Sequence, residues 1–430
     1  MSEFDDAYLR MQQFGGAMLS RLADYKGPID SIRAGKEELP SGCPGRASAI
    51  HTYYLAKVDE DLAEVNVAMK EVIARVWREC AEENAESASV ASDSSANGVD
   101  AETLVRLKFC VNRPHVVILG AGASVAAFPT GDANGKSLPL MANIVGLLGL
   151  KRDLAKAGCD PKMDFESLYS QLHGTDPNSP TIRLIEQRVE EYFGSLRLPE
   201  HPTLYDVLLL SLREKDAILT FNWDPLLADT YARYAGQVRL PHMLHLHGNV
   251  RVGFCEHCHT AGDRRQPCAG CKTTLIPSRL LYPVPEKNYD AADAFISTQW
   301  KQAREFIKNA VLITIFGYRA PETDKEAMAI LTEAWKPTGR DRLFEQIEII
   351  DVRDSGELGR QWAPFSFYGH YQTHRSILES RLARYPRRSC EALYSTHIEG
   401  KWVSEIPWGW NLAGLRARIA ELQEYEHERT

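Results

Sequence analysis

Four short apolar runs dominate the hydrophobic pattern of the chain after residue 114. Each is rich in Val and Ile and apolar at consecutive positions, unlike the alternating pattern of a half-exposed strand. They are HVVILG (115–120), DAILTFN (216–222), VLITIFG (311–317) and IEIIDV (347–352). Helical patterns separate them, as at 181–196 and 324–335. Strands buried on both faces and alternating with helices predict an α/β fold, a Rossmann-like doubly wound parallel sheet.

The regions around this sheet show other patterns. Apolar residues recur at helical spacing within 1–85, which predicts an N-terminal helical region. Residues 86–110 are expected to link it to the sheet domain, 111–355. The stretch 81–102 is rich in Ala, Ser, Glu and Asp and has little to bury, so we expect it to be flexible. A surface helix over 81–90 is an equally good interpretation of its first half.

The remaining residues, 356–430, are expected to form a C-terminal helical tail that ends in an amphipathic helix. Three tryptophans are expected to dock this helix on the body, with an oligomer contact as the alternative; they are Trp402, Trp408 and Trp410. A run of arginines in the tail is typical of a solvated surface; it comprises Arg381, Arg384, Arg387 and Arg388.

Composition narrows the classes of function. The net charge of −8 counts against general nucleic-acid binding, because neutralising phosphates requires excess Lys and Arg. The longest apolar runs are too short to cross a bilayer, and the N-terminus MSEFDDAYLR lacks the apolar core of a signal peptide. Four of the nine cysteines form two tight pairs, which favours one metal site in a reduced compartment. The expected location is the cytoplasm.

The cysteine pairs predict a structural zinc site. Cys255 and Cys258 are separated by two residues, as are Cys268 and Cys271, and nine residues lie between the pairs. Four thiolates at tetrahedral reach bind zinc in a closed, chemically inert shell. A nearby histidine in place of one cysteine is the alternative. The module is expected to span 250–275.

Glycines follow the first apolar run. The run continues into Gly120, Ala121, Gly122 and Ser124 and then into a helical pattern. Glycines at a strand end let backbone N–H groups approach a pyrophosphate beside a helix N-terminus. The same spacing also serves simple packing of a helix against a strand, and Val125 stands where the dinucleotide fingerprint has Gly or Ala.

Polar residues follow the second run. Asn222 and Asp224 come directly after a buried strand, where ligands bind in open α/β sheets. An Asn side chain can bind a carboxamide, a ribose hydroxyl or a water. The alternative is that one of them caps the next helix, a role that suits Asp224 before Pro225.

Other candidates lie further along the chain. His247 precedes Gly248, whose missing side chain could admit a substrate, and its near-neutral pKa suits a general base. Thr323 and Glu326 predict a capping box that opens a helix after the third run. Asp351, at the end of the fourth run, is placed to accept hydrogen bonds from a ribose or to form a cap or salt bridge.

These motifs together resemble the sirtuin superfamily. GAGAS (120–124), TFNWD (220–224), LHG (246–248) and the two Cys-x-x-Cys pairs occur in the family's order within about 110–355. The resemblance implies a Rossmann-like domain that binds NAD, with His247 as general base and with Asn222 and Asp224 at the nicotinamide ribose and carboxamide. The expected NAD site comprises Gly120, Ala121, Gly122, Ser124, Thr220, Asp224, Gly317, Tyr318 and Asp351, with Asn222 and His247 as catalytic residues.

The departures from the family are specific. Deacylating sirtuins follow the glycine loop with an Ile-Pro-Asp-Phe-Arg type of segment, where this chain reads AAFPTGDANGKSLPLM. Phe221 replaces a Gln, and GYRAPETD stands at Gly317 in place of a Gly-Thr-Ser stretch. These features are similar to the sirtuin-like domains of bacterial antiphage defence proteins, which cleave NAD. That similarity implies a homo-oligomer and a partner protein, such as an ATPase or nuclease of the same defence system.

Three functions follow. An NAD glycohydrolase, with NAD as substrate and zinc as a structural metal, is the expected one, because departure of nicotinamide requires positioning and a water more than a strong nucleophile. A protein deacylase needs an acyl-lysine tunnel, and the missing Phe-Arg segment counts against it. A module that binds NAD or ADP-ribose without turnover is the third. Because unregulated NAD loss would kill the host, an active enzyme is expected to be held off by assembly or by a partner.

Overall fold

The computed structural model describes most of the chain after residue 111. Described are residues 112–284, 287, 289, 293–336, 345–366 and 370–397, with 403, 405, 417, 421 and 423. All belong to the second of the two units into which the chain divides, Val99–Thr430. The predicted N-terminal helical region, the linker 86–110, the three tryptophans and most of the terminal helix lie outside the described residues.

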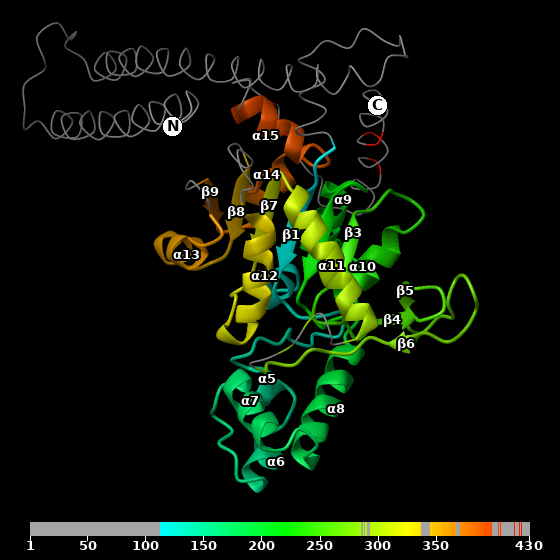
Figure 1. Cartoon of the computed structure of the whole chain (residues 1–430), viewed down its shortest axis with the longest axis vertical. Coiled ribbons are helices and arrows are strands. Elements are labelled where there is room, and N and C mark those ends of the chain that lie inside the picture. Colours follow the sequence, from blue (N-terminus) through cyan, green and yellow to red (C-terminus); the bar gives the residue numbers. More distant parts are fainter. Residues whose placement is uncertain are drawn as a thin grey trace, which may run out of the picture. The chain divides into compact units, whose positions relative to one another are not determined.

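A six-stranded parallel sheet forms the centre of the fold (Figure 1). Its strands are β1 (His115–Leu119), β2 (Ala217–Thr220), β3 (His242–His245), β7 (Leu312–Phe316), β8 (Gln346–Ile350) and β9 (Tyr371–His374). Their spatial order is β3-β2-β1-β7-β8-β9, and every neighbouring pair is parallel. Counted along the chain, this is the order 3-2-1-4-5-6 of the Rossmann fold. The predicted fold class is confirmed, and the four apolar runs are the four central strands.

The hydrophobic pattern does not predict the two edge strands, β3 and β9. β1, β2 and β7 are buried at every position, so consecutive apolar residues are required there. In β3 and β9 the first residues are partly or fully exposed, and polar residues occupy them. An edge strand of this kind does not produce a continuous apolar run.

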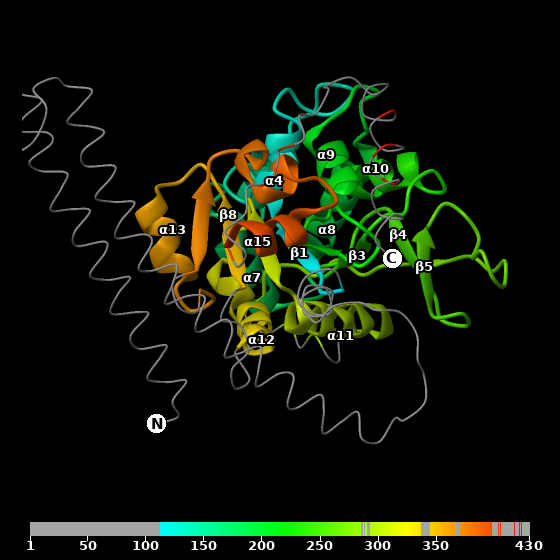
Figure 2. The ribbon, with the colours of Figure 1, turned by 90° about the horizontal axis from the view of Figure 1, so that it is seen from above.

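Helices cover both faces of the sheet, which makes it doubly wound (Figure 2). One face packs against α4 (Ala121–Ala127), α9 (Leu204–Ser211) and α10 (Leu226–Tyr234). The other packs against α11 (Ala294–Asn309), α12 (Lys325–Trp335) and α13 (Ser355–Trp362). Alternate residues of β1 divide between the two cores: Val117 and Leu119 face the first, whereas Val116 and Ile118 face the second.

A further helical segment lies between α4 and α9, below the sheet in Figure 1. It comprises α5 (Ile144–Leu147), α6 (Lys151–Lys156), α7 (Phe165–Thr175) and α8 (Pro180–Ser195). The predicted helix 181–196 is confirmed as α8, which Ser179 caps by accepting a hydrogen bond from the Ile182 N–H. The apolar faces of α7 and α8 extend the core on the α4 side of the sheet.

A small antiparallel sheet stands beside the main one (Figure 1). Its strands are β4 (Val252–Cys255), β5 (Thr260–Asp263) and β6 (Ile276–Pro277), in the order β5-β4-β6. It is inserted between β3 and α11 and carries the cysteine pairs.

The main sheet continues after residue 355, because α13 leads into β9. Then follow the 3-10 helix η4 (Ile377–Glu379), α14 (Arg381–Arg384) and α15 (Ser389–His397). The interpretation of the arginine run as solvated surface is wrong for Arg381 and Arg387, which are 9% and 2% exposed. The Arg387 guanidinium donates to the Leu212 and Arg239 carbonyls, so protein acceptors take the place of water. Among the helices the structure describes, none is long and apolar enough to cross a membrane.

Candidate active site

The predicted site residues follow the carboxyl ends of neighbouring parallel strands. Gly120 follows β1, Asn222 follows β2, His247 follows β3, and Gly317 follows β7. Because parallel strands end at the same edge of a sheet, residues far apart in sequence meet there. Because β1 and β2 are neighbours, the glycine segment after β1 and the Asn222 segment after β2 are in direct contact.

A buried polar cluster joins those two motifs. Ser124 Oγ donates to Asp224 Oδ2 at 2.6 Å, and the Tyr205 hydroxyl lies 2.7 Å from the same Oγ. Asn222 Nδ2 donates to Gly120 O and to Ser124 Oγ, both at 3.0 Å. All four side chains are buried. The predicted cofactor residue Ser124 and the predicted catalytic residue Asn222 therefore belong to one network.

This network sets which way the Asn222 amide points. The Gly120 carbonyl can only accept a hydrogen bond, so the group that faces it must be the NH2. The Ser124 hydroxyl gives its proton to Asp224 and accepts from Asn222. Asn222 Oδ1 must then point the other way, and no residue in the described part of the chain donates to it. Asn222 therefore keeps an acceptor oxygen that no described residue uses.

Asp224 and Thr220 support this arrangement. Asp224 Oδ1 also accepts from the Leu226 N–H at 3.1 Å, so Asp224 both holds Ser124 and stabilises the start of α10. Burial raises the pKa of Asp224, and the hydrogen bonds from Ser124 and Leu226 oppose that shift. The predicted cofactor residue Thr220 accepts from the Asn222 N–H through Oγ1 at 3.1 Å. It shapes the turn on which Asn222 lies.

The glycines at this edge pack against one another. A Cβ on Gly120 would lie 2.5 Å from Tyr318 Cα, and a Cβ on Gly317 would lie 2.2 Å from the Ala123 N. The Gly120 and Gly122 N–H groups donate to Phe316 O and Gly317 O. The close contact between the β1–α4 loop and the β7–η2 loop thus requires these glycines. This agrees with the alternative interpretation, in which the glycines serve packing of the backbone. Two N–H groups of the loop are used within the protein and are not free for a phosphate.

His247 lies buried beside an aromatic wall. The ring centroids of His247 and Phe221 are 4.7 Å apart at an interplanar angle of 88°. His247 Nε2 lies 3.2 Å from the Tyr289 hydroxyl. Burial lowers the pKa of His247 to about 3, so the imidazole is neutral at physiological pH. A neutral ring can accept a proton, as the predicted general base must.

The role expected for Gly248 is wrong. A Cβ at Gly248 would lie 2.0 Å from the Arg279 carbonyl oxygen, and its φ of +76° favours glycine. The space that a side chain would fill is thus occupied by protein backbone and does not admit a substrate. The Leu281 N–H also donates to His247 O at 3.0 Å. The chain that leaves the small sheet therefore returns to the His247 turn.

The predicted capping box of Thr323 and Glu326 does not form. The 3-10 helix η2 (Glu322–Asp324) precedes α12, and no side chain caps its first turn. Thr323 Oγ1 instead donates to Glu166 on α7 at 3.1 Å, and Glu326 accepts from the Lys287 N–H at 3.3 Å. Partners from other elements compete for both side chains, which the local pattern cannot reveal.

Asp324, at the end of η2, has a place in the site. Lys287 Nζ donates to Asp324 Oδ1 and, at 2.9 Å, to the Thr323 carbonyl. The Tyr318 hydroxyl donates to Asp324 Oδ2 at 2.9 Å. Asp324 Oδ1 lies 3.7 Å from His247 Nε2. Tyr318, predicted for the cofactor, also stacks on Phe221 with ring centroids 4.2 Å apart.

Asp351 lies apart from these contacts. Arg353 Nη2 donates to Asp351 Oδ2 at 2.8 Å, and Arg353 Nε donates to Oδ1 at 3.1 Å. The salt-bridge alternative therefore describes Asp351 in this structure. Its carboxylate contacts neither Asn222 nor His247.

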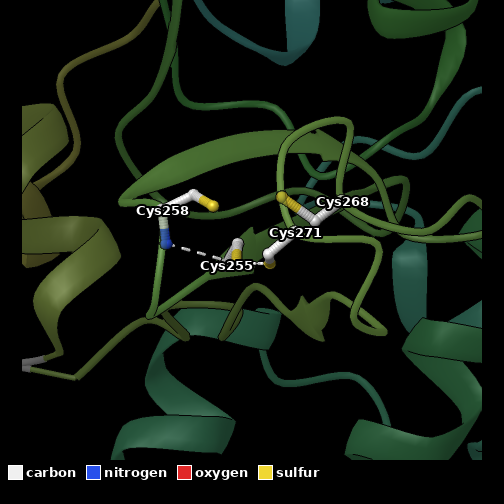
Figure 3. Close-up of side chains that lie close together, drawn as sticks. All are labelled: Cys255, Cys258, Cys268 and Cys271. Atoms are coloured by element: carbon white, nitrogen blue, oxygen red, sulfur yellow. Dashed lines mark hydrogen bonds between the residues drawn. The ribbon is translucent and has the colours of Figure 1, made fainter.

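The four cysteines of the small sheet converge (Figure 3). Cys255, Cys258, Cys268 and Cys271 have sulfur atoms that all lie within 4.8 Å of one another. A tetrahedral zinc shell places its sulfurs about 3.8 Å apart, so the spacing and the donor type are compatible with zinc. Neither His257 nor His259 belongs to the cluster, which favours the four-cysteine shell.

Several neighbours of the site escaped prediction. Tyr205 lies in the first turn of α9. The capping box of Thr203 and Asp206 indicates the start of this helix, but nothing in the sequence indicates the contact between Tyr205 and Ser124. Lys287 and Tyr289 lie in a segment without a recognisable motif. Asn249 Nδ2 donates to Asp224 O at 2.7 Å and ties the His247 turn to the Asn222 turn.

Comparisons with known proteins give fold neighbours at low identity. No protein-family model and no curated protein matches the chain. A crystal structure of a Sir2 homologue in complex with NAD matches at 16% identity over 70% of this chain and 98% of that chain, with a TM-score of 0.36. A structure described as a basis for the mechanism and regulation of Sir2 enzymes matches at 15% identity, 68% and 98% coverage, and a TM-score of 0.34. Sir2 bound to acetylated peptide matches at 16% identity, 70% and 97% coverage, and a TM-score of 0.28. All three TM-scores lie below 0.5, so these likenesses carry no conclusion about the chemistry of the site.

Proposed function

We propose that this protein is an NAD glycohydrolase, which cleaves NAD to nicotinamide and ADP-ribose. The observation that carries the proposal is the fixed Asn222 amide, whose Oδ1 accepts from no described residue, on the turn tied by Asn249 to the turn that bears neutral His247. An acceptor oxygen and a neutral imidazole on adjacent strand ends suit a reaction that needs a positioned water and a proton acceptor.

The chemistry asks for little covalent help from the protein. Nicotinamide leaves with the electron pair of the C–N glycosidic bond, and the ribose becomes oxocarbenium-like. A water then forms the new C–O bond and loses one proton. Asn222 Oδ1 accepts a hydrogen bond from this water or from the carboxamide, and His247 receives the proton. Burial keeps His247 neutral before the reaction, so a ring nitrogen lone pair is available for the proton, and the same burial makes this ring a weaker base than a free imidazole.

The cysteine cluster has a structural part in this proposal. Cys255, Cys258, Cys268 and Cys271 would hold a zinc ion, which supplies rigidity and no reactive position. The module starts after Gly248 and its far end returns to His247 through the Leu281 N–H. A rigid module would therefore also hold the chain where it returns to the His247 turn.

The cellular role is proposed to be NAD depletion in bacterial antiphage defence. Such an activity must be restrained until infection, so we infer a homo-oligomer or a complex with an ATPase or nuclease of the same system. Residues 1–110 and the C-terminal tail are the proposed interfaces. Light scattering and NAD turnover measured on the same preparation test this: a monomer that turns over NAD freely contradicts restraint by assembly.

Chromatography of NAD incubated with the full chain, with and without the products of neighbouring genes, tests the activity. Asn222→Ala and His247→Ala are each expected to lower cleavage by about 10²- to 10⁴-fold, the usual contribution of a positioned acid or base. Asn222→Asp keeps the shape but loses the NH2 that Gly120 fixes. His242→Ala is the matched control, since His242 is exposed at the start of the same strand, β3.

Each outcome has a clear meaning. Nicotinamide and ADP-ribose that form only with intact Asn222 and His247 support the proposal. Full cleavage by both alanine variants refutes the mechanism. Turnover only in the presence of an acyl-lysine peptide favours the deacylase. Tight NAD binding without turnover under every condition favours the binding module.

A further inference from the structure

A buried ion pair beside His247 has no part in the cleavage chemistry described above. Lys287 and Asp324 have side chains that are 3% and 7% exposed, and they contact each other directly. Moving two charges out of water is costly, so such a pair is weak evidence for a gain in stability. Its position against His247 Nε2 suggests a use in the site.

The polar groups that face His247 all approach one nitrogen. Asp324 Oδ1 lies 3.7 Å from Nε2, and the Tyr289 hydroxyl lies 3.2 Å from it. Phe221 presents its ring and offers no acceptor. No residue in the described stretches forms a hydrogen bond to Nδ1. Both ring nitrogens of His245 are fully buried without a partner, whereas Nδ1 of His247 is not fully buried. Nδ1 is the nitrogen that remains accessible.

We propose that Asp324 is a positioning residue for His247: it favours the tautomer that carries the proton on Nε2 and so leaves Nδ1 as the nitrogen that receives the proton from water. The inference rests on the proposed NAD cleavage only for this last step. In that step the water O–H bond breaks, its electron pair forms the bond to the ribose carbon, and the proton moves to Nδ1. A carboxylate beside one nitrogen of a neutral imidazole favours the proton on that nitrogen, and the Tyr289 hydroxyl can then accept from Nε2–H.

The surroundings keep Asp324 ionised for this role. Burial alone raises the pKa of Asp324, but the Lys287 ammonium and the hydrogen bond from the Tyr318 hydroxyl help to hold the pKa below its ordinary value. A carboxylate attracts the N–H side of the ring and repels a bare nitrogen lone pair. Glu166, which accepts from Thr323, is a further carboxylate in the neighbourhood but does not contact His247.

The two members of the pair act on His247 with opposite sign. Asp324 raises the pKa of His247 and Lys287 lowers it, on top of the larger lowering by burial. Asp324→Asn should therefore weaken His247 as a proton acceptor, whereas Lys287→Met should strengthen it. If the ion pair had only a structural role, loss of either charge would change the basicity of His247 in the same direction.

The test reads the tautomer directly. The full chain carrying ¹⁵N-labelled histidine is studied at neutral pH by long-range ¹H–¹⁵N correlation, and the His247 signal is assigned by its loss in His247→Gln. The wild type is expected to show protonated Nε2 and bare Nδ1. Asp324→Asn is expected to lose population of that form, and the control Glu166→Gln is expected to keep it.

NAD cleavage is then followed against pH. In Asp324→Asn we expect a lower kcat with KM little changed and an acid limb at lower pH, and in Lys287→Met an acid limb at higher pH. If the single variants do not fold, the neutral pair Lys287→Gln with Asp324→Asn replaces them and is expected to lose the Nε2–H form. Protonated Nδ1 in the wild type, or shifts in the same direction for both single variants, overturns the inference. Because the tautomer is read without NAD, failure of the proposed function leaves a separate result.

Discussion

His245 offers a quantitative test of what burial does to this fold. It lies at the end of β3 and is 3% exposed, and both of its ring nitrogens are sealed without a partner among the described residues. Burial lowers its pKa from 6.5 to about 4. His115 is lowered to about 4 and His247 to about 3, each mainly by burial. Three histidines are therefore neutral in the native state where the unfolded chain protonates them.

The direction of the pH effect follows from linkage. Because the native pKa lies below the unfolded value, unfolding takes up a proton between about pH 4 and 6.5. The stability that neutral His245 contributes is thus present above pH 6.5 and is lost as the pH falls through this window. From pH 6.5 to 5.0, one such histidine costs roughly 1.5 kcal/mol, and three cost roughly 5 kcal/mol.

The perturbation is His245→Leu, measured by urea denaturation at several pH values between 5.0 and 6.5. The free energy of unfolding of the variant should fall less steeply, so that the difference from wild type changes by roughly 1.5 kcal/mol in favour of the variant across the window. Packing of the leucine shifts both ends equally, which makes the slope the diagnostic quantity. His242→Leu, at the exposed start of β3, is the control. Parallel curves for wild type and His245→Leu would refute the reasoning.

Three other outcomes are expected from the structure. Gly317→Ala places a Cβ 2.2 Å from the Ala123 N at a φ of +61°. It should lower the free energy of unfolding measured in urea by about 1–3 kcal/mol and weaken NAD binding measured by calorimetry. Wild-type values in both assays would contradict the packing argument. Arg387→Met leaves the Leu212 and Arg239 carbonyls without a buried donor and should cost about 2–4 kcal/mol in the same assay, unlike a change at an exposed arginine. Zinc release by a mercurial reagent should yield about one ion per chain and much less from Cys268→Ser, and equal release from both would rule out this cluster as the site.

The central sheet and the local motifs could be predicted from the sequence alone. A strand buried on both faces must be apolar at consecutive positions, so β1, β2, β7 and β8 are visible as continuous runs. The alternation of these runs with helical patterns leaves few topologies other than a doubly wound sheet. The spacing of the cysteine pairs is equally direct evidence, because a tetrahedral shell demands ligands on tight turns.

Only the tertiary structure decided which residues meet. The edge strands β3 and β9 are half exposed and carry polar residues, so no run marks them. Tyr205 joins Asn222 to Ser124, which lies 81 residues before it in the chain, and no local pattern encodes that contact. Asp324 lies between the two residues of the predicted capping box. Thr323 and Glu326 bond to other elements instead, and Asp324 lies beside His247.

The same distinction holds for the glycines. Their positions at strand ends are plain in the sequence, but their purpose depends on what lies opposite. A Cβ at Gly248 would meet the Arg279 carbonyl, so backbone occupies the space that a substrate was expected to enter, and Gly120 packs against the loop at Gly317. Sequence determines where a chain can turn and what it must bury, because those are properties of single residues and their near neighbours. The partner of a buried polar group depends on the whole fold, since hydrogen bonds and charges are satisfied across elements that only the folded chain brings together.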